Sequence, residues 1–140
     1  MEIRMINETD DLFGSPIYVY TRSQAFEDGV LIDVSDMAKK AGFKIPVAIT
    51  RVIWDQYIEW TDKDSDKQTI QDQAGRLWDV LWMLHIACKQ NHDESSIGYR
   101  LYVIPRDGRS KKPCLINLKS VIGGGDNGEP VITIMLPNED

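Results

Sequence analysis

Residues 69–90 (TIQDQAGRLWDVLWMLHIACKQ) constrain the fold of this chain more than any other stretch. Apolar residues recur there every three or four positions, which is the spacing of one face of an α-helix. This first row consists of Ile70, Ala74, Leu77, Trp78, Leu81, Leu84 and Cys88. A second row, of Trp82, Met83, Ile86 and Ala87, makes the last three turns apolar nearly all round. A helix of this kind must be covered on most sides, and we predict a long central core helix.

The polar side of the predicted central helix is narrow and lies in its first half. Asp72 and Arg76 are four positions apart, so we expect an exposed ion pair worth only about 0.2–0.5 kcal/mol. Gly75 costs roughly 1 kcal/mol relative to Ala in a helix interior, which indicates a close backbone contact there. Ser65 or Asp66, in the polar stretch before the helix, is predicted to cap its N-terminus.

Short strands and helices are predicted in the N-terminal half. Residues 17–20 (IYVY) and 30–34 (VLIDV) are expected to form strands, each followed by a short helix. The residues that should cap these helices are Thr21 and Ser35, and those that should end them are Gly29 and Gly42.

The next stretch leads toward the central helix. Residues 46–49 (PVAI) form either a strand or the first turn of a helix, and the helical pattern continues from Thr50. Residues 61–67 (TDKDSDK) are predicted to be a solvated linker, because they are almost entirely polar.

Three further strands are predicted in the C-terminal half, at residues 99–104, 114–122 and 131–136. Turn sequences separate them, PRDG at residues 105–108 and GGGDNG at 123–128, so an antiparallel meander is the simplest arrangement. We therefore predict an α+β fold in which an antiparallel sheet packs on the long central helix, with short helices in the N-terminal half. Residues 1–12 are predicted to be a flexible lead-in and residues 13–140 a single globular domain, as the chain length indicates.

The composition narrows the classes of partner. The chain carries 22 acidic and 16 basic residues and a formal net charge of -6, which argues against generic nucleic-acid binding. No apolar run reaches the ~18 residues of a membrane span, and the N-terminus lacks the features of a signal peptide. We therefore expect a cytoplasmic protein without a membrane partner. Cys88 and Cys114 sit among apolar residues and are expected to be buried free thiols, which suits a reducing compartment.

One group of acidic residues has a spacing found in calcium loops. Asp62, Asp64 and Asp66 match the first positions of such a loop. Lys67 and Gln73 occupy the positions that need glycine and glutamate, so we do not predict a calcium site.

A second group resembles a zinc ligand set. His85, Cys88 and His92 lie three and four positions apart, and Cys114 could complete the four ligands. However, Cys88 lies on an apolar helix face and His92 in a predicted loop, so we expect His85 to be a core histidine with one hydrogen-bond partner. The chain also lacks the common catalytic and nucleotide-binding motifs. We therefore expect no metal, no cofactor and no catalytic residue.

Two charged surfaces are candidates for binding. The first is the loop RDGRSKK, in which Arg106, Arg109, Lys111 and Lys112 lie within seven residues. These cations on a hairpin tip either contact a phosphate or an acidic partner, or serve solubility alone. The second surface is the acidic stretch at residues 55–72, which either mimics nucleic-acid phosphates or stays solvated. Its acidic residues are Asp55, Glu59, Asp62, Asp64, Asp66 and Asp72. The sequence leaves open which of the two surfaces is functional.

Several long segments carry a resemblance to a known family. They are FGSPIYVYTRSQAFEDGVLIDVSDMAKKAGFKIPVAITRVIWD, QDQAGRLWDVLWML, IPRDGR and GDNGEPVITIMLPNED. These segments resemble a family of small uncharacterised bacterial proteins carried on plasmids and prophages, a domain of unknown function. The resemblance implies a genomic setting in which genes often counteract host defence or adjust maintenance of the element. It thus implies a non-enzymatic accessory protein that binds another macromolecule, a protein or nucleoprotein.

A second resemblance supports an enzymatic alternative. The segment IYVYTRSQAFEDGVL is similar to the entry of ADP-ribosyltransferase folds, and Glu129 precedes the last strand where such enzymes place their catalytic glutamate. The usual histidine or arginine of the first strand is absent. The resemblance implies a divergent enzyme with Tyr20, Arg22 and Glu129 near its pocket. A cleft that holds all three side chains would favour the enzyme, and a flat charged face would favour the binding protein.

Overall fold

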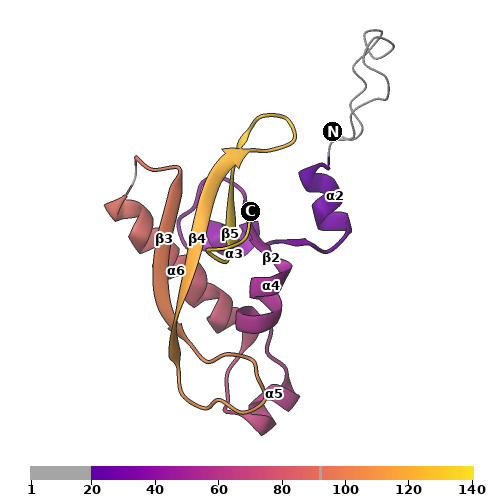
Figure 1. The fold of residues 1–140 in the computed structure, drawn as a ribbon, viewed down its shortest axis with the longest axis vertical. Helices are drawn as coiled ribbons and strands as arrows, with labels where there is room; N and C mark the ends of the chain where they lie inside the picture. The colour runs from indigo at the N-terminus through magenta and orange to yellow at the C-terminus, as the bar shows by residue number, and fades with distance from the viewer. Residues whose placement is uncertain (1–19, 92) are drawn as a thin grey trace.

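A five-stranded mixed sheet lies at the centre of the computed structural model, which describes residues 20–91 and 93–140 (Figure 1). Its strands are β1 (Leu31–Asp33), β2 (Val47–Thr50), β3 (Ser96–Val103), β4 (Cys114–Gly124) and β5 (Pro130–Met135). Their order in space is β1-β2-β5-β4-β3. The predicted antiparallel meander of β3, β4 and β5 is confirmed, but β2 and β5 are parallel. The prediction of a wholly antiparallel sheet is therefore wrong, because β5 inserts between β4 and a strand of the N-terminal half.

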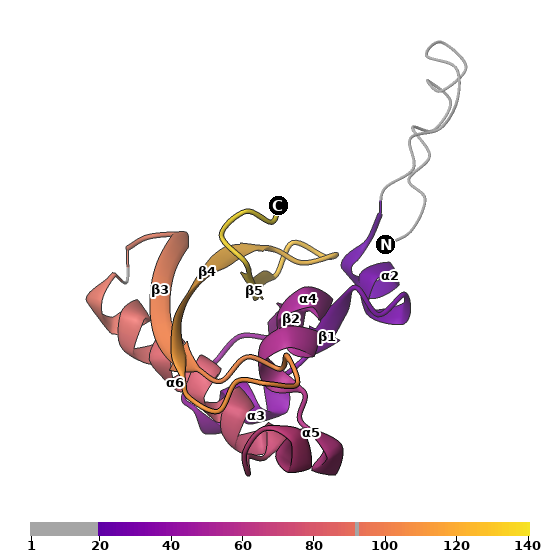
Figure 2. The same ribbon diagram turned by 60° about the horizontal axis from the view of Figure 1, so that its bottom comes forward.

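The longest helix, α6, packs on one face of the sheet. The helical segments are α2 (Arg22–Glu27), α3 (Ser35–Lys40), α4 (Arg51–Ile53), the π-helical turn η2 (Trp54–Ile58), α5 (Asp62–Lys67) and α6 (Gln73–Gln90). Figures 1 and 2 show α6 crossing under β3 and β4, with α3 and α4 on the same side of the sheet. The α+β class follows the prediction. The predicted long central helix is matched in part, by a single helix of 18 residues.

The core forms between α6 and the inner face of the sheet. Side chains alternate between buried and exposed along the whole of β3, as expected for a strand with one covered face. The inward-facing side chains of β3 are Ile97, Tyr99, Leu101 and Val103, and those of α6 include Leu77, Val80, Leu81 and Leu84. The hydroxyl of Tyr99 donates a hydrogen bond to the carbonyl oxygen of Val80 (3.1 Å), which satisfies a polar group inside this core.

The outer face of the sheet is covered unevenly. The chain after β5 folds back over β2, where Glu139 Oε1 accepts hydrogen bonds from the Thr50 hydroxyl (2.8 Å) and the Leu136 N–H (2.8 Å). On β3 and β4, by contrast, the outward side chains of Arg100, Tyr102 and Asn117 are exposed. The outer face of this pair of strands is therefore accessible.

The start of α6 differs from the prediction. The helix begins at Gln73, and the side chain of Asp72 caps it by accepting a hydrogen bond from the Gly75 N–H (2.7 Å). The predicted caps at Ser65 and Asp66 are therefore wrong. The predicted pair of Asp72 with Arg76 is also wrong, because Asp72 serves as the cap and Arg76 is only 6% exposed.

Local capping also changes two other predictions. Residues 61–67 are not a linker: Thr61 and Asp64 form a reciprocal capping box, so the polar segment folds as α5. Ser35 is the first residue of α3 rather than its cap, and its hydroxyl oxygen accepts a hydrogen bond from the Val47 N–H (3.1 Å). The Thr21 cap of α2 is confirmed.

Burial along α6 is less complete than predicted. Trp82 is 41% exposed and Ile86 is 36% exposed, so the C-terminal turns are open on one side. Both cysteines are free, as predicted, but Cys88 is only half-buried and Cys114 is exposed. The prediction of two buried thiols is therefore wrong. Cys114 is the first residue of β4, and burial along this strand begins only at its third residue.

Some expectations fall outside this description. The lead-in at residues 1–12, most of the strand at 17–20, and His92 are not among the described residues. Within the described part, no helix combines the length and the apolar character needed to cross a membrane.

Candidate binding surface

Positive charge is concentrated in one hairpin, formed by β3, β4 and the loop between them. Residues 96–124 contain six of the 16 basic residues of the chain and one of its 22 acidic residues. The basic residues are Arg100, Arg106, Arg109, Lys111, Lys112 and Lys119. We call this segment the cationic hairpin. It is a local basic surface on a protein whose net charge is negative.

The loop of the cationic hairpin is bound to α5 and η2. Arg106 forms ion pairs with Asp64 (Nε to Oδ2, 2.8 Å) and Glu59 (Nη1 to Oε1, 3.2 Å). Its N–H donates to the carbonyl oxygen of Gln56 (3.0 Å). The hydrogen bond to Asp64 raises the pKa of Arg106. The basic loop and the acidic stretch are therefore adjacent (Figure 1), and the Arg106 charge is paired within the chain.

Two side chains hold the loop in one shape. The buried Gln68 donates from Nε2 to the carbonyl oxygens of Pro105 (2.9 Å) and Ser110 (2.6 Å), and its Oε1 accepts from the Gly108 N–H (3.0 Å). Asp107 accepts hydrogen bonds from the hydroxyl and N–H of Ser110 and from the N–H of Arg109. These bonds lower the pKa of Asp107 to about 2. Sequence reasoning missed Gln68, since a polar residue in a polar segment gives no signal of burial.

The remaining loop cations are available for binding. Arg109, Lys111 and Lys112 are exposed, and within the described chain no salt bridge involves them. They lie beside the accessible outer face of β3 and β4, which carries Arg100 and Lys119 and no acidic residue. The structure thus extends the predicted basic loop into a longer surface, along the two strands that lead into and out of it.

A groove runs beside this surface, between α6 and β3. It has a volume of about 470 Å³ and is lined by Asp79, Trp82, Met83, Arg100, Leu101, Tyr102 and Leu115. Trp82 stacks on Trp78 (5.7 Å between ring centroids) and on His85 (5.1 Å), so its ring is held in place although it is exposed. Tyr102 is 68% exposed on the strand side. Sequence reasoning missed this groove because Trp82 has the same helical spacing as core residues.

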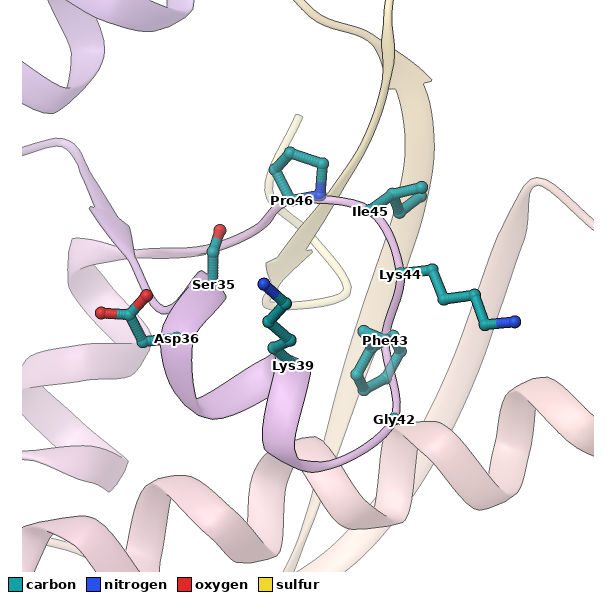
Figure 3. Close-up of a pocket in the computed structure, with 8 residues that line it drawn as sticks. All are labelled: Ser35, Asp36, Lys39, Gly42, Phe43, Lys44, Ile45 and Pro46. Atoms are coloured by element: carbon teal, nitrogen blue, oxygen red, sulfur yellow. The ribbon is translucent and has the colours of Figure 1, made fainter.

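A second hollow, of about 560 Å³, lies around the end of α3 (Figure 3). Figure 3 shows that the side chains of Lys39 and Lys44 point in different directions and that the Asp36 carboxylate points away from both. The Ser35 hydroxyl is engaged by β2. Because these polar groups do not converge, the hollow contains no arrangement for acid–base or nucleophilic chemistry.

The residues of the enzymatic alternative lie near a third hollow, of about 450 Å³, which Tyr20 and Arg22 help to line. The Arg22 guanidinium is turned to the sheet, where it donates to Thr133 Oγ1 (2.7 Å) and to the carbonyl oxygen of Ile132 (3.1 Å). Glu129 is not among the lining residues, and its carboxylate accepts from the Asn127 N–H (3.0 Å). The structure thus brings two of the three residues to one hollow and places the third beside it.

The possible zinc ligands are used differently. His85 packs its ring against Trp82 and Phe43, and Cys88 and Cys114 lie on α6 and at the start of β4. Over residues 20–91 and 93–140, no group of three or more His, Cys, Asp or Glu side chains is arranged to hold a metal ion.

Comparison with known proteins places the chain in a family. No curated protein and no solved structure matches it. A family model matches residues 11–140, which include all of the sheet and its helices. The chain therefore belongs to the DUF6573 family, a family of unknown function.

Proposed function

We propose that this protein is a non-enzymatic binding protein that recognises another macromolecule through its cationic hairpin. The observation that carries the proposal is the charge separation: six basic residues and one acidic residue lie in residues 96–124 of a chain with net charge -6. Basic residues placed for solubility alone need not gather on one hairpin. Their concentration favours a surface with a specific anionic partner.

The shape of the loop supports this proposal. Gln68 and Asp107 fix the loop backbone before any partner binds, so less conformational entropy is lost on association. Arg109, Lys111 and Lys112 extend from this fixed backbone into solvent. Each exposed pair contributes only about 0–1 kcal/mol, but together such charges increase the association rate.

The net charge favours a protein or nucleoprotein partner over free nucleic acid. A long polyanion would lie beside the acidic remainder of the molecule as well as beside the hairpin, and the two interactions oppose each other. A compact acidic patch on a protein can contact the hairpin cations and extend along less of the acidic remainder. We propose further that the protein acts in the cytoplasm of bacteria that carry plasmids or prophages, where its partner is a host protein and one outcome is interference with host defence.

The test compares two variants that each lose three exposed cations. The first changes Arg109, Lys111 and Lys112 to Ala, and the control changes Lys39, Lys40 and Lys44, around α3, to Ala. The partner is first isolated from a bacterial host by affinity capture and identified by mass spectrometry. Association rates with the purified partner are then measured at low and at physiological salt. We expect the hairpin variant to associate about tenfold more slowly at low salt and to lose most of its salt dependence. Equal rates for the hairpin and control variants would overturn the proposal.

A further inference from the structure

One long edge of the sheet is formed by β3, whose outer backbone groups face away from the neighbouring strand. Among the residues that the structure describes, 20–91 and 93–140, β3 is the last strand of the sheet and pairs only with β4. The Ile122 N–H donates to the carbonyl oxygen of Ser95 (2.8 Å), so Ser95 and Ile122 are a hydrogen-bonded pair of the antiparallel ladder. Every second residue of the strand after Ser95 is bonded to β4 in the same way. By alternation, the N–H and C=O groups of Gly98, Arg100 and Tyr102 point away from β4. These groups form a row of backbone donors and acceptors along the open edge.

Within the described part of the chain, this edge lacks the usual protection against pairing with another chain. Edge strands are commonly short, interrupted by proline or a bulge, or covered by another element. β3 has eight residues without a proline, and its register with β4 is continuous. Arg100 is its one charged residue. A strand of this length and regularity can pair with an added strand.

The groove described above lies directly against this edge. Its α6 wall consists of Asp79, Trp82 and Met83, and its strand wall includes Leu101 and Tyr102. Figure 2 shows the C-terminal turns of α6 beside β3 at the outer end of the sheet. An added strand would therefore pair with β3 through its backbone and place alternate side chains over the apolar surface of α6.

We propose that the edge of β3 binds an extended segment of the partner protein as a sixth strand of the sheet. Alternate side chains of this segment are apolar and pack against Trp82 and Met83. The others are acidic and lie on the outer face of the sheet beside Arg100. The inference rests on the proposed function, because it identifies the partner as a protein and describes how part of it binds.

Charge complementarity selects this occupant over a second copy of the chain. Two β3 edges that pair about a two-fold axis near the middle of the strand would bring the two Arg100 side chains close together on the same face, which is unfavourable. An acidic segment converts the same position into an attraction. On the inner side, Asp79 disfavours acidic residues, and burial raises the pKa of this carboxyl. The two faces of the added strand therefore have different preferred chemistry.

The test uses a capped synthetic peptide of seven alternating valines and glutamates, with the 15N-labelled full chain. We expect the peptide to protect the amides of Gly98, Arg100 and Tyr102 from hydrogen exchange, in every second residue of β3. A peptide of the same sequence, N-methylated on the amides that face β3, is the matched control and should give no protection. Arg100→Glu should weaken binding of this peptide about fivefold and strengthen binding of a valine–lysine peptide.

Four outcomes would overturn the inference. The first three are equal binding of the N-methylated peptide, exchange protection confined to other strands, and a dimer in sedimentation experiments that protects these amides without peptide. Protection of these amides by a single-stranded oligonucleotide, without protection by the peptide, would also overturn it. The loop variant of Arg109, Lys111 and Lys112 separates the two proposals. It should bind the peptide normally. Failure of the wild-type chain to bind the peptide would thus overturn the edge-strand inference alone, and equal association rates for the loop and control variants would overturn the proposed function.

Discussion

The guanidinium of Arg76 lies over the indole ring of Trp60, with 4.3 Å between Cζ and the ring centroid. Arg76 is buried, and it donates from Nε to the carbonyl oxygen of Ile58 (3.1 Å) and from Nη1 to that of Ile104 (2.9 Å). Burial lowers the pKa of Arg76 to about 10. One side chain of α6 thus joins the end of η2 to the end of β3, where the cationic loop begins.

Replacing Arg76 should destabilise the fold strongly. Arg76→Met keeps much of the apolar stem but leaves two buried carbonyl oxygens without donors. We expect a loss of about 2–4 kcal/mol in the free energy of unfolding, measured by urea denaturation. The control is Arg51→Ala, which removes an exposed pair with Asp55 on a helical turn and should cost no more than about 0.5 kcal/mol. Similar midpoints for both variants would show that Arg76 does not join these elements.

The two apolar rows of α6 should differ in their contribution to stability. Leu81 is fully buried, so Leu81→Ala should cost about 2–5 kcal/mol. Trp82 is 41% exposed in the groove, and Trp82→Ala should cost only about 1 kcal/mol. Urea denaturation of both variants checks this order. A larger loss at Trp82 would mean that the groove is closed by packing in solution.

The depressed pKa of Asp107 predicts how the loop responds to acid. Its folded-state pKa is about 2, against an ordinary value of 3.8, so its contribution to stability is present above 3.8 and is lost as the pH falls through about 2. An NMR titration should therefore show the Ser110 amide shifting with a midpoint near 2. The Asp107→Asn variant should lack this step. A midpoint near 3.8 would mean that the carboxylate is not held by these hydrogen bonds.

The parts of the fold with regular local patterns were predictable from the sequence. Core positions along α6 follow helical spacing, and the alternation in β3 and the turns around Gly108 and Gly128 indicate the meander. These signals are local, since the period of burial is set by the backbone geometry of one element. The parallel pairing of β2 with β5 was not predictable in this way. It joins residues about 85 positions apart, for example Val47 and Ile132, and depends on which strand covers the open edge of β5.

The candidate binding surface was predictable only in part. Four cations close together in the sequence identified the loop, but sequence spacing could not show that Arg106 pairs with Asp64 across 42 positions. The groove at Trp82 gave no distinct signal, because a helix that extends past the edge of a sheet has the same apolar pattern as one that is fully covered. Exposure depends there on where the sheet ends, which is a property of the tertiary fold.

The enzymatic alternative can be tested directly. The Arg22 guanidinium is engaged by the sheet, and burial lowers the pKa of this side chain. We therefore expect no release of nicotinamide when the protein is incubated with NAD, and no change in Glu129→Gln. Nicotinamide release above background that is lost in Glu129→Gln would support the hypothesis of an ADP-ribosyltransferase-like enzyme and contradict a purely binding function.

The two thiols should react at different rates in the native protein. Cys114 is exposed at the start of β4, whereas Cys88 is half-buried on α6 and burial raises its pKa. Because the thiolate is the reactive form, both exposure and pKa slow Cys88 relative to Cys114. An aromatic disulfide reagent should give one fast phase and one slow phase of equal amplitude, and Cys114→Ser should remove the fast phase alone. In denaturant both thiols should react at the fast rate. Two fast phases in the native protein would show that the C-terminal turns of α6 open readily, and the α6 wall of the groove beside β3 would then not be fixed in solution.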